Sequence, residues 1–224
     1  MTPSTFSRST SKCVPGHPPG PLMPVHCRVG VDLEIVVPAF NEADRLPETL
    51  DHMVAYLSSQ PWRSRVVVVD NGSADETAGV VRSLQPRGVE VVVIGCARPG
   101  KGAAVRRGLL HASSPFVGFV DADLSTPLDT LATVMNELRQ GAAVVVASRH
   151  ASGARFVQPQ PLGRRLGGAV FRMLARPLVA GVRDTQCGFK VFQRDVVQRA
   201  LQRCRLTGFA FDVELLRQIQ LAGG

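Results

Sequence analysis

The feature that most limits the possible fold is a repeated alternation of short apolar runs with segments of helical periodicity. The apolar runs are rich in valine and isoleucine, and turns containing Gly, Pro, Asn or Asp separate them from the helical segments. A chain of this kind is expected to form an α/β fold, with a mostly parallel central sheet and helices on both faces. The predicted strands are 32–38, 65–70, 89–94, 116–120 and 142–147, and the predicted helices are 43–58, 74–84, 103–112 and 128–139.

Two aspartates follow the fourth apolar run, with only Ala122 between them. If 116–120 is a buried strand, its alternation places Asp121 and Asp123 on one side of the strand's end. Ligands of open α/β sheets bind at the carboxyl ends of strands, and a hard divalent cation takes carboxylates together with phosphate oxygens. The pair therefore suggests a metal-bound diphosphate, such as that of a nucleotide-sugar. The simpler alternative is that these residues only cap the next helix.

Two other turns between predicted elements have informative residues. Ser73, with Glu76 three positions later, has the pattern of a capping box at the start of the helix that ends near Leu84. Lys101 lies in the Gly-rich turn 99–102 before the next helix, where it could reach a diphosphate. This turn is no Walker motif, because Gly102 follows the lysine in place of Ser or Thr. An ordinary loop lysine is the alternative.

The net charge of +8 is concentrated in one region of the chain. Between Arg149 and Arg205 there are 12 Lys and Arg against 2 acids, so this region carries the whole positive excess. Such a field implies an anionic partner, unless it is only a solvated basic face. The composition argues against nucleic acid as the partner, since one Trp and one Tyr provide no stacking platform. A segment predicted to be helical, 162–179, has arginines on one stripe and could pack on the domain or lie in a membrane interface.

The N-terminal segment, the cysteines and the lengths of the apolar runs say little about the chemistry of the protein. Residues 1–30 are rich in Pro, Ser and Thr, have no acid, and are expected to be a disordered tail. The five cysteines form no Cys-x-x-Cys pair, which favours reduced thiols over a zinc site or a disulfide framework. No apolar run approaches the length of a membrane span, so we expect a cytoplasmic protein that at most contacts the membrane peripherally.

Several loops, taken in order, resemble one known family. They are Val37-Pro-Ala-Phe-Asn-Glu42, Val69-Asp-Asn-Gly-Ser-Ala-Asp75, Gly100-Lys-Gly-Ala-Ala-Val-Arg-Arg-Gly108, Asp121-Ala-Asp123, Ser148-Arg149 and Asp184-Thr-Gln-Cys-Gly-Phe-Lys190. Together they resemble a family-2 inverting glycosyltransferase of the GT-A fold, in the branch that makes polyprenyl-phosphate or dolichyl-phosphate sugars. The resemblance implies one GT-A domain over 31–224, with a nucleotide-sugar half (31–148) and an acceptor half (149–224). Because members of the branch usually continue beyond the last helix, it also leads us to expect a C-terminal truncation at Gly224.

The resemblance also implies roles for particular residues. The metal ligands would be Asp121 and Asp123, holding Mg²⁺ or Mn²⁺, and the catalytic residues would be Asp123, Arg149 and Asp184. Arg149 would face the acceptor phosphate, with Arg155, Arg164 or Arg165 nearby. Asn71 stands where the family usually has a second aspartate, which leaves the base preference open. The nucleotide and its diphosphate would be held by Pro38, Ala39, Glu42, Asp70, Asn71, Lys101, Asp121 and Ala122.

The implied reaction moves a hexose, glucose or mannose, from UDP-glucose or GDP-mannose to a polyprenyl phosphate. A lipid phosphate is already anionic, so arginines that place it are needed more than a general base. Transfer to a hydroxyl of a glycolipid or glycan is the first alternative, and it would need a carboxylate base such as Asp184 or Asp212. The second alternative is a nucleotide-sugar-binding protein without activity.

Overall fold

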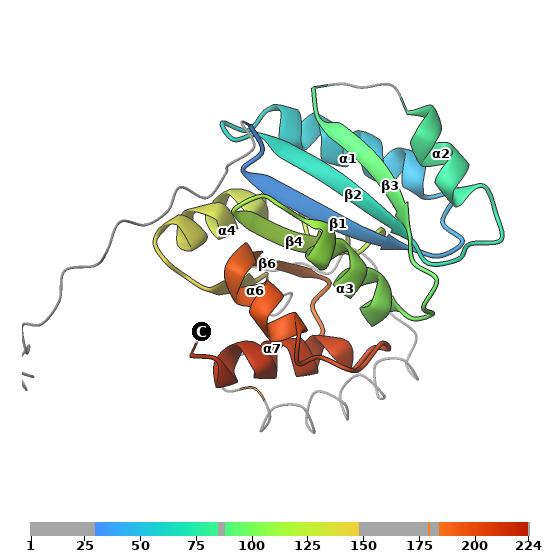
Figure 1. Ribbon diagram of the computed structural model, residues 1–224. Helices are drawn as coiled ribbons and strands as arrows, with labels where there is room; N and C mark the ends of the chain where they lie inside the picture. Colours follow the sequence, from blue (N-terminus) through green and yellow to red (C-terminus); the bar gives the residue numbers. More distant parts are fainter. Residues whose placement is uncertain (1–29, 85–87, 148–178, 180–183, 224) are drawn as a thin grey trace, which may run out of the picture.

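The computed structural model describes residues 30–84, 88–147, 179 and 184–223, and these residues form a six-stranded sheet covered by helices (Figure 1). Several predicted features lie outside the described residues: the expected N-terminal tail except for Gly30, the helix 162–179 except for its last residue, and Arg149, Arg155, Arg164 and Arg165. The strands are β1 (Leu33–Ala39), β2 (Ser64–Asp70), β3 (Glu90–Gly95), β4 (Phe116–Val120), β5 (Val144–Val146) and β6 (Phe189–Gln193). The helices are α1 (Leu46–Ser58), α2 (Thr77–Ser83), α3 (Lys101–His111), α4 (Thr130–Arg139), α6 (Arg194–Leu201) and α7 (Phe211–Leu221).

The strand order is β3-β2-β1-β4-β6-β5, and the first four strands in this order are parallel. The chain moves outward from β1 to β3, then returns through α3 to place β4 on the other side of β1. Their junction is therefore the point where the strand order reverses, which is where α/β sheets bind ligands. β6 pairs antiparallel with both β4 and β5, so the sheet is mostly but not wholly parallel.

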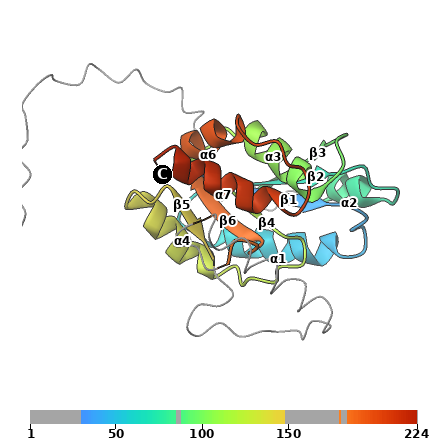
Figure 2. The ribbon, with the colours of Figure 1, turned by 90° about the horizontal axis from the view of Figure 1, so that it is seen from below.

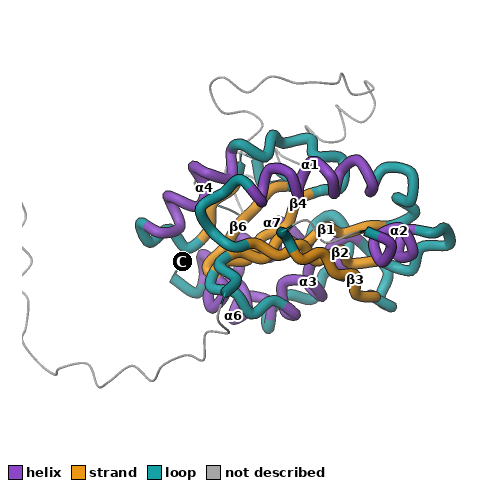
Figure 3. The backbone as a smooth tube through the Cα atoms, turned by 90° about the horizontal axis from the view of Figure 1, so that it is seen from above, coloured by secondary structure: helices purple, strands orange, loops and turns teal. Residues whose placement is uncertain are grey.

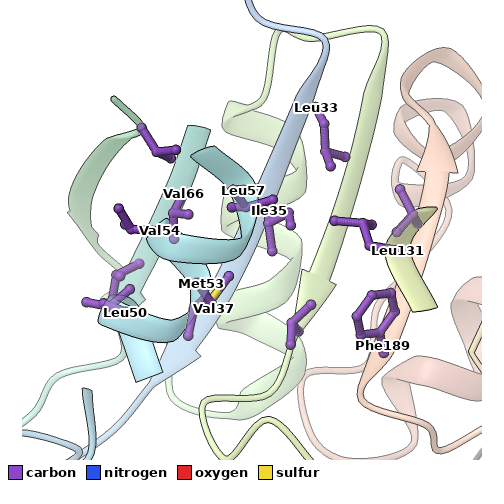
Figure 4. Close-up of a cluster of buried hydrophobic side chains, with 14 of the residues drawn as sticks. Leu33, Ile35, Val37, Leu50, Met53, Val54, Leu57, Val66, Leu131 and Phe189 are labelled. Carbon is purple, nitrogen blue, oxygen red and sulfur yellow. The ribbon is translucent and has the colours of Figure 1, made fainter. Parts of the chain in front are cut away.

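One face of the sheet is covered by α1 and α4, with α2 beside α1 (Figure 2). The core on this face joins Leu50 and Met53 of α1 and Leu131 of α4 to Ile35 of β1 and Phe189 of β6, as the close-up in Figure 4 shows. Each of these side chains is fully buried. The apolar stripe of α1 repeats every three or four residues, which is why its sequence predicts a helix packed on a sheet.

The opposite face is covered by α3, α6 and α7, which Figure 2 shows together on that side of the sheet. From above, α3 and α6 are seen on this side, across the sheet from α1 and α4 (Figure 3). Leu109 of α3 and Phe211 of α7 pack there against Phe119 of β4 and Phe192 of β6, whose rings are stacked with centroids 6.4 Å apart. Both faces of the strands are therefore buried, as a parallel sheet requires.

The predicted elements are all present among the described residues, with differences at their ends. The first helix begins at Leu46 and not at residue 43. Pro47 lies in its first turn, where the backbone N–H that proline lacks would have no partner within the helix. The predicted capping box is wrong. Helix α2 begins after Glu76 with no side-chain cap, because the Ser73 hydroxyl accepts the N–H of Asn41 instead. The helix after the Gly-rich turn begins at Lys101, so this lysine belongs to α3 and not to a loop.

Within the part of the chain that the structure describes, no helix has both the length and the apolarity needed to cross a membrane.

Candidate active site at the carboxyl ends of the strands

A cavity of about 550 Å³ opens where β1, β2 and β4 end and α3 begins. It brings together residues that are up to 171 positions apart, from Pro38 to Phe209. Residues predicted to hold a nucleotide or a metal make up much of its wall: Pro38, Ala39, Glu42, Asn71, Lys101, Asp121, Ala122 and Asp123. The cavity therefore lies at the reversal point of the sheet and contains most of the predicted site.

The loop after β1 is held in place by the loop after β2. The N–H of Glu42 donates to Thr77 Oγ1 (2.9 Å), and the N–H of Ala43 donates to Asp75 Oδ2 (3.1 Å). Asn41, with φ +54°, accepts the N–H of Ala74 through its side chain (2.9 Å). Asparagine tolerates this left-handed conformation better than most residues. These bonds fix the backbone that forms one wall of the cavity.

The side chain of Asn71 connects the ends of β2 and β3 to the start of α3. Its Nδ2 donates to the carbonyls of Cys96 (3.2 Å) and Arg98 (2.7 Å), and its Oδ1 accepts the N–H of Gly100 (2.8 Å). An aspartate could not make the two donor bonds, because a carboxylate only accepts. Asparagine at this position thus holds the loop that carries Lys101, while also lining the cavity.

Lys101 and Asp121 form an ion pair inside the cavity. The lysine Nζ is 2.7 Å from Oδ1 and 2.8 Å from Oδ2 of the carboxylate, and the two side chains are 22% and 29% exposed. Burial raises the pKa of Asp121 above its ordinary value, and the charge and hydrogen bond of Lys101 oppose this rise. The lysine thus offsets the cost of placing a carboxylate in this half-buried position.

The carboxylate of Asp121 packs directly on the backbone of Gly188. A Cβ added at Gly188 would lie 2.0 Å from Asp121 Oδ2, so only glycine leaves room for it. The N–H of Asp121 also donates to the carbonyl of Gly188 (2.9 Å), which continues the antiparallel pairing of β4 with β6. The loop before β6 therefore positions Asp121.

The two residues that follow Asp121 are oriented by short-range and long-range hydrogen bonds. The carbonyl of Ala122 accepts the hydroxyl of Thr49 in α1 (2.6 Å). Asp123 is exposed, and its Oδ1 accepts the N–H of Ser125 (3.0 Å). The chain reverses at Leu124, which has φ +45°. Both aspartates line the same cavity, so the structure brings the pair together as the sequence predicts.

The donor chemistry of this site fits a hard divalent cation. Asp121 and Asp123 supply carboxylate oxygens, and a bound diphosphate would supply further oxygens of the kind that Mg²⁺ and Mn²⁺ accept. No cluster of three or more His, Cys, Asp or Glu side chains suited to a metal occurs in the described residues. A cation here would thus depend on ligand oxygens as well as on the protein.

Two predicted site residues lie outside the lining of the cavity. Asp70 ends β2, and its Oδ1 accepts the N–H of Ser73 (3.1 Å). Asp184 is 1% exposed, and its carbonyl accepts the N–H of Cys187. Arg149, which was also predicted for the site, lies outside the described residues. Asp212, the other candidate base, is 5% exposed and accepts from Lys190 Nζ at 2.6 Å.

The cavity also contains residues that we did not predict for the site. Phe40 and Arg45 flank Glu42, and Arg45 pairs with that glutamate at 2.6 Å. Both lie in or next to the loop motif 37–42, so their position in the sequence could have predicted them as site residues. Phe209, which is 73% exposed, comes from the segment between α6 and α7. It has no such signal, because only tertiary packing brings it to the cavity.

The fold and the cavity define a class: α/β proteins whose sheet has a ligand-sized cavity, lined by carboxylates and a lysine, at its reversal point. Within that class, residues 34–201 match the family model described as "Glycosyl transferase family 2". The chain belongs to this family, as its loops predicted.

The similar curated proteins include several dolichyl-phosphate beta-glucosyltransferases. The one from Trichomonas vaginalis called ALG5C is 33% identical over 204 residues, which cover 84% of this chain and 60% of that protein. The one from Homo sapiens is 34% identical over 200 residues, covering 82% and 61%. The chain thus spans about three fifths of the length of these relatives.

Solved structures confirm the GT-A fold. Glucosyl-3-phosphoglycerate synthase from Mycobacterium tuberculosis, in complex with Mn²⁺, UDP-glucose and phosphoglyceric acid, superposes with a TM-score of 0.58 at 24% identity. The match covers 84% of this chain and 65% of the other. The same enzyme in complex with Mg²⁺ and UDP gives a TM-score of 0.54 at 22% identity.

Proposed function

We propose that this protein transfers a hexose from a nucleotide-sugar to dolichyl phosphate or a related polyprenyl phosphate, with Mg²⁺ or Mn²⁺ at Asp121 and Asp123. Glucose from UDP-glucose is the first candidate, and mannose from GDP-mannose is the second. The names of the curated relatives support glucose and dolichyl phosphate. The protein would work at the cytoplasmic face of a membrane, where its acceptor's phosphate is accessible.

The observation that carries this proposal is the convergence of five chain segments on one cavity. The ends of β1, β2 and β4 and the start of α3 supply backbone, an amide, three carboxylates, one guanidinium group and one ammonium group, and Phe209 comes from the loop before α7. Helix N-termini attract phosphate groups, and α3 begins at this cavity. This arrangement suits a nucleoside diphosphate with a cation, which is the leaving group of the proposed reaction.

In the proposed reaction an oxygen of the acceptor phosphate attacks the anomeric carbon of the sugar. The bond from that carbon to the diphosphate breaks, and its electron pair leaves with the nucleoside diphosphate. A bound divalent cation would stabilise the charge that develops there. The chain's own contribution is to bind the diphosphate with Lys101, to supply the two aspartates that would hold the cation, and to align the acceptor through its basic half, including Arg149.

The positions of the two carboxylates that the sequence suggests as bases, Asp184 and Asp212, support a phosphate acceptor over a hydroxyl acceptor. A hydroxyl would need a carboxylate base within reach, and the two candidates are both buried. Asp212 is held by Lys190, and Asp184 lies outside the cavity lining. A phosphate is already ionised and needs no base.

The test is a transfer assay with the full chain, Mn²⁺, labelled UDP-glucose or GDP-mannose, and either dolichyl phosphate or a saccharide. We expect glucosylated lipid from UDP-glucose. Asp123→Ala should lower the rate more than about 100-fold, as loss of a group that stabilises developing charge does. Asp129→Ala, on the same connection but outside the cavity lining, is the matched control and should keep the rate.

Three results would contradict parts of this proposal. Transfer to the saccharide alone would point to a hydroxyl acceptor. Stabilisation by UDP-glucose in a thermal melt, without transfer to either acceptor, would point to a binding protein without activity. Full activity of Asp123→Ala would exclude its metal role.

A further inference from the structure

Lys101 places a positive charge at the positive end of a helix. It is the first residue of α3, whose N-terminal dipole disfavours a cation. The pair with Asp121, in which Nζ lies within 2.8 Å of both carboxylate oxygens, offsets this cost. A bound diphosphate would offer the same ammonium group another partner, because it approaches the same helix end.

The two members of this pair differ in their freedom to move. Asp121 is held by the sheet through its N–H and is packed against the backbone of Gly188. Lys101 reaches it through a flexible four-carbon side chain, so its ammonium group can move to another position in the cavity by a change of rotamer. If the pair opens, the lysine must be the member that leaves.

The charges in the cavity explain why the pair would open. The lining contains three acids, Glu42, Asp121 and Asp123, and two bases, Arg45 and Lys101. Arg45 forms an ion pair with Glu42, and Lys101 forms an ion pair with Asp121. A cation that arrives alone therefore finds Asp121 already neutralised, whereas one that arrives with a diphosphate brings an anion that attracts the lysine away.

We propose that Lys101 and the divalent cation exchange places at Asp121, and that this exchange makes metal and nucleotide bind cooperatively. In the empty site the lysine serves as the counter-cation of Asp121. When a nucleoside diphosphate binds, the lysine moves to the diphosphate and opens Asp121 to the metal. The inference rests on the proposed function, since it needs the same cation and nucleotide, but it adds an order to their binding.

The experiment measures Mn²⁺ binding to the full chain by electron paramagnetic resonance, with and without UDP, after subtraction of the Mn–UDP complex formed in buffer. For the native protein, UDP should raise Mn²⁺ affinity at least about fivefold, the lower end of ordinary coupling between sites. In Lys101→Met, Mn²⁺ alone should bind about fivefold more tightly or better, and the enhancement by UDP should fall by a similar factor. Lys101→Arg retains a cation and should behave like the native protein.

Arg45→Met is the matched control, because it removes the same charge from the same cavity without touching Asp121. It should raise the affinity for Mn²⁺ alone less than Lys101→Met does and leave the UDP enhancement intact. Equal effects of the two variants, or no effect of Lys101→Met, would overturn the exchange. Thermal melts confirm that each variant is folded. If the native protein binds UDP but shows no Mn²⁺ binding beyond the Mn–UDP complex in buffer, the metal in the proposed function is wrong and the exchange is wrong with it. If Mn²⁺ binds with the same affinity with and without UDP, only the exchange is wrong.

Discussion

At the scale of single residues, the site depends on a glycine as much as on the charged groups. Gly188 has no unusual φ, so its role is not conformational. It is needed because the Asp121 carboxylate occupies the space where its side chain would be. The motif Asp184–Lys190 thus contributes to the site because Gly188 has no side chain, which leaves the space that the Asp121 carboxylate fills.

Gly188→Ala tests this dependence. The new methyl group must push the Asp121 carboxylate aside or shift β6, at a cost of about 1–3 kcal/mol in the free energy of unfolding. Stabilisation by Mn²⁺ with UDP should also disappear, because Lys101 and the metal lose their partner. Urea unfolding and thermal melts with ligand measure both effects. Gly95→Ala, where an added Cβ meets nothing within 4 Å, should keep ligand stabilisation; if both variants keep it, the contact is unimportant.

At the scale of elements, a buried carboxylate connects β1 to the turn before β4. Glu34 is fully buried, and its Oε1 accepts the N–H groups of Ser113 (2.7 Å) and Ser114 (2.9 Å). Its Oε2 is 3.5 Å from Arg65 in β2. These contacts align the two strands whose junction carries the cavity.

The same contacts make this connection sensitive to pH. Burial by itself raises the pKa of Glu34, but the hydrogen bonds from Ser113 and Ser114 and the charge of Arg65 outweigh it, so the pKa lies below the ordinary 4.5. A lowered pKa in the folded protein stabilises it above pH 4.5, and this stabilisation is lost as the pH falls below that value.

Glu34→Gln should therefore lower the free energy of unfolding by about 1–3 kcal/mol at neutral pH, since it weakens bonds of a buried charged group. The difference from the native protein should shrink as the pH falls below 4.5. Urea titrations at neutral and acid pH measure it. Glu90→Gln removes an exposed carboxylate that also pairs with Arg65, at 2.8 Å, and should change stability by less than about 0.5 kcal/mol. A constant difference at all pH values would contradict the assignment.

At the scale of the whole molecule, the two larger hydrophobic cores of the described residues lie on opposite faces of one sheet. Leu50 belongs to the core under α1 and α4, and Leu109 to the core under α3, α6 and α7. Because the side chains of both cores pack on the same sheet, the described domain is expected to unfold as one cooperative unit.

Leu50→Ala and Leu109→Ala should each lower the free energy of unfolding by about 2–5 kcal/mol, because both side chains are fully buried. The double variant should show the sum within about 0.5 kcal/mol and a single transition, since the sheet separates the two sites. Leu110→Ala, at a position 44% exposed, is the control and should change little. Two resolved transitions in urea would contradict a single cooperative unit.

The sequence alone determined the strand and helix order, because side-chain periodicity is a local property of each segment. Strand alternation also predicted that Asp121 and Asp123 lie on one side of a strand's end, and the family resemblance implied that Pro38 and Ala39 line the nucleotide pocket. Only the tertiary structure decided that β6 lies antiparallel between β4 and β5, that Lys101 pairs with Asp121, and that Phe209 lines the cavity. These depend on contacts between distant segments, and the spacing within one segment does not specify which distant partner it meets.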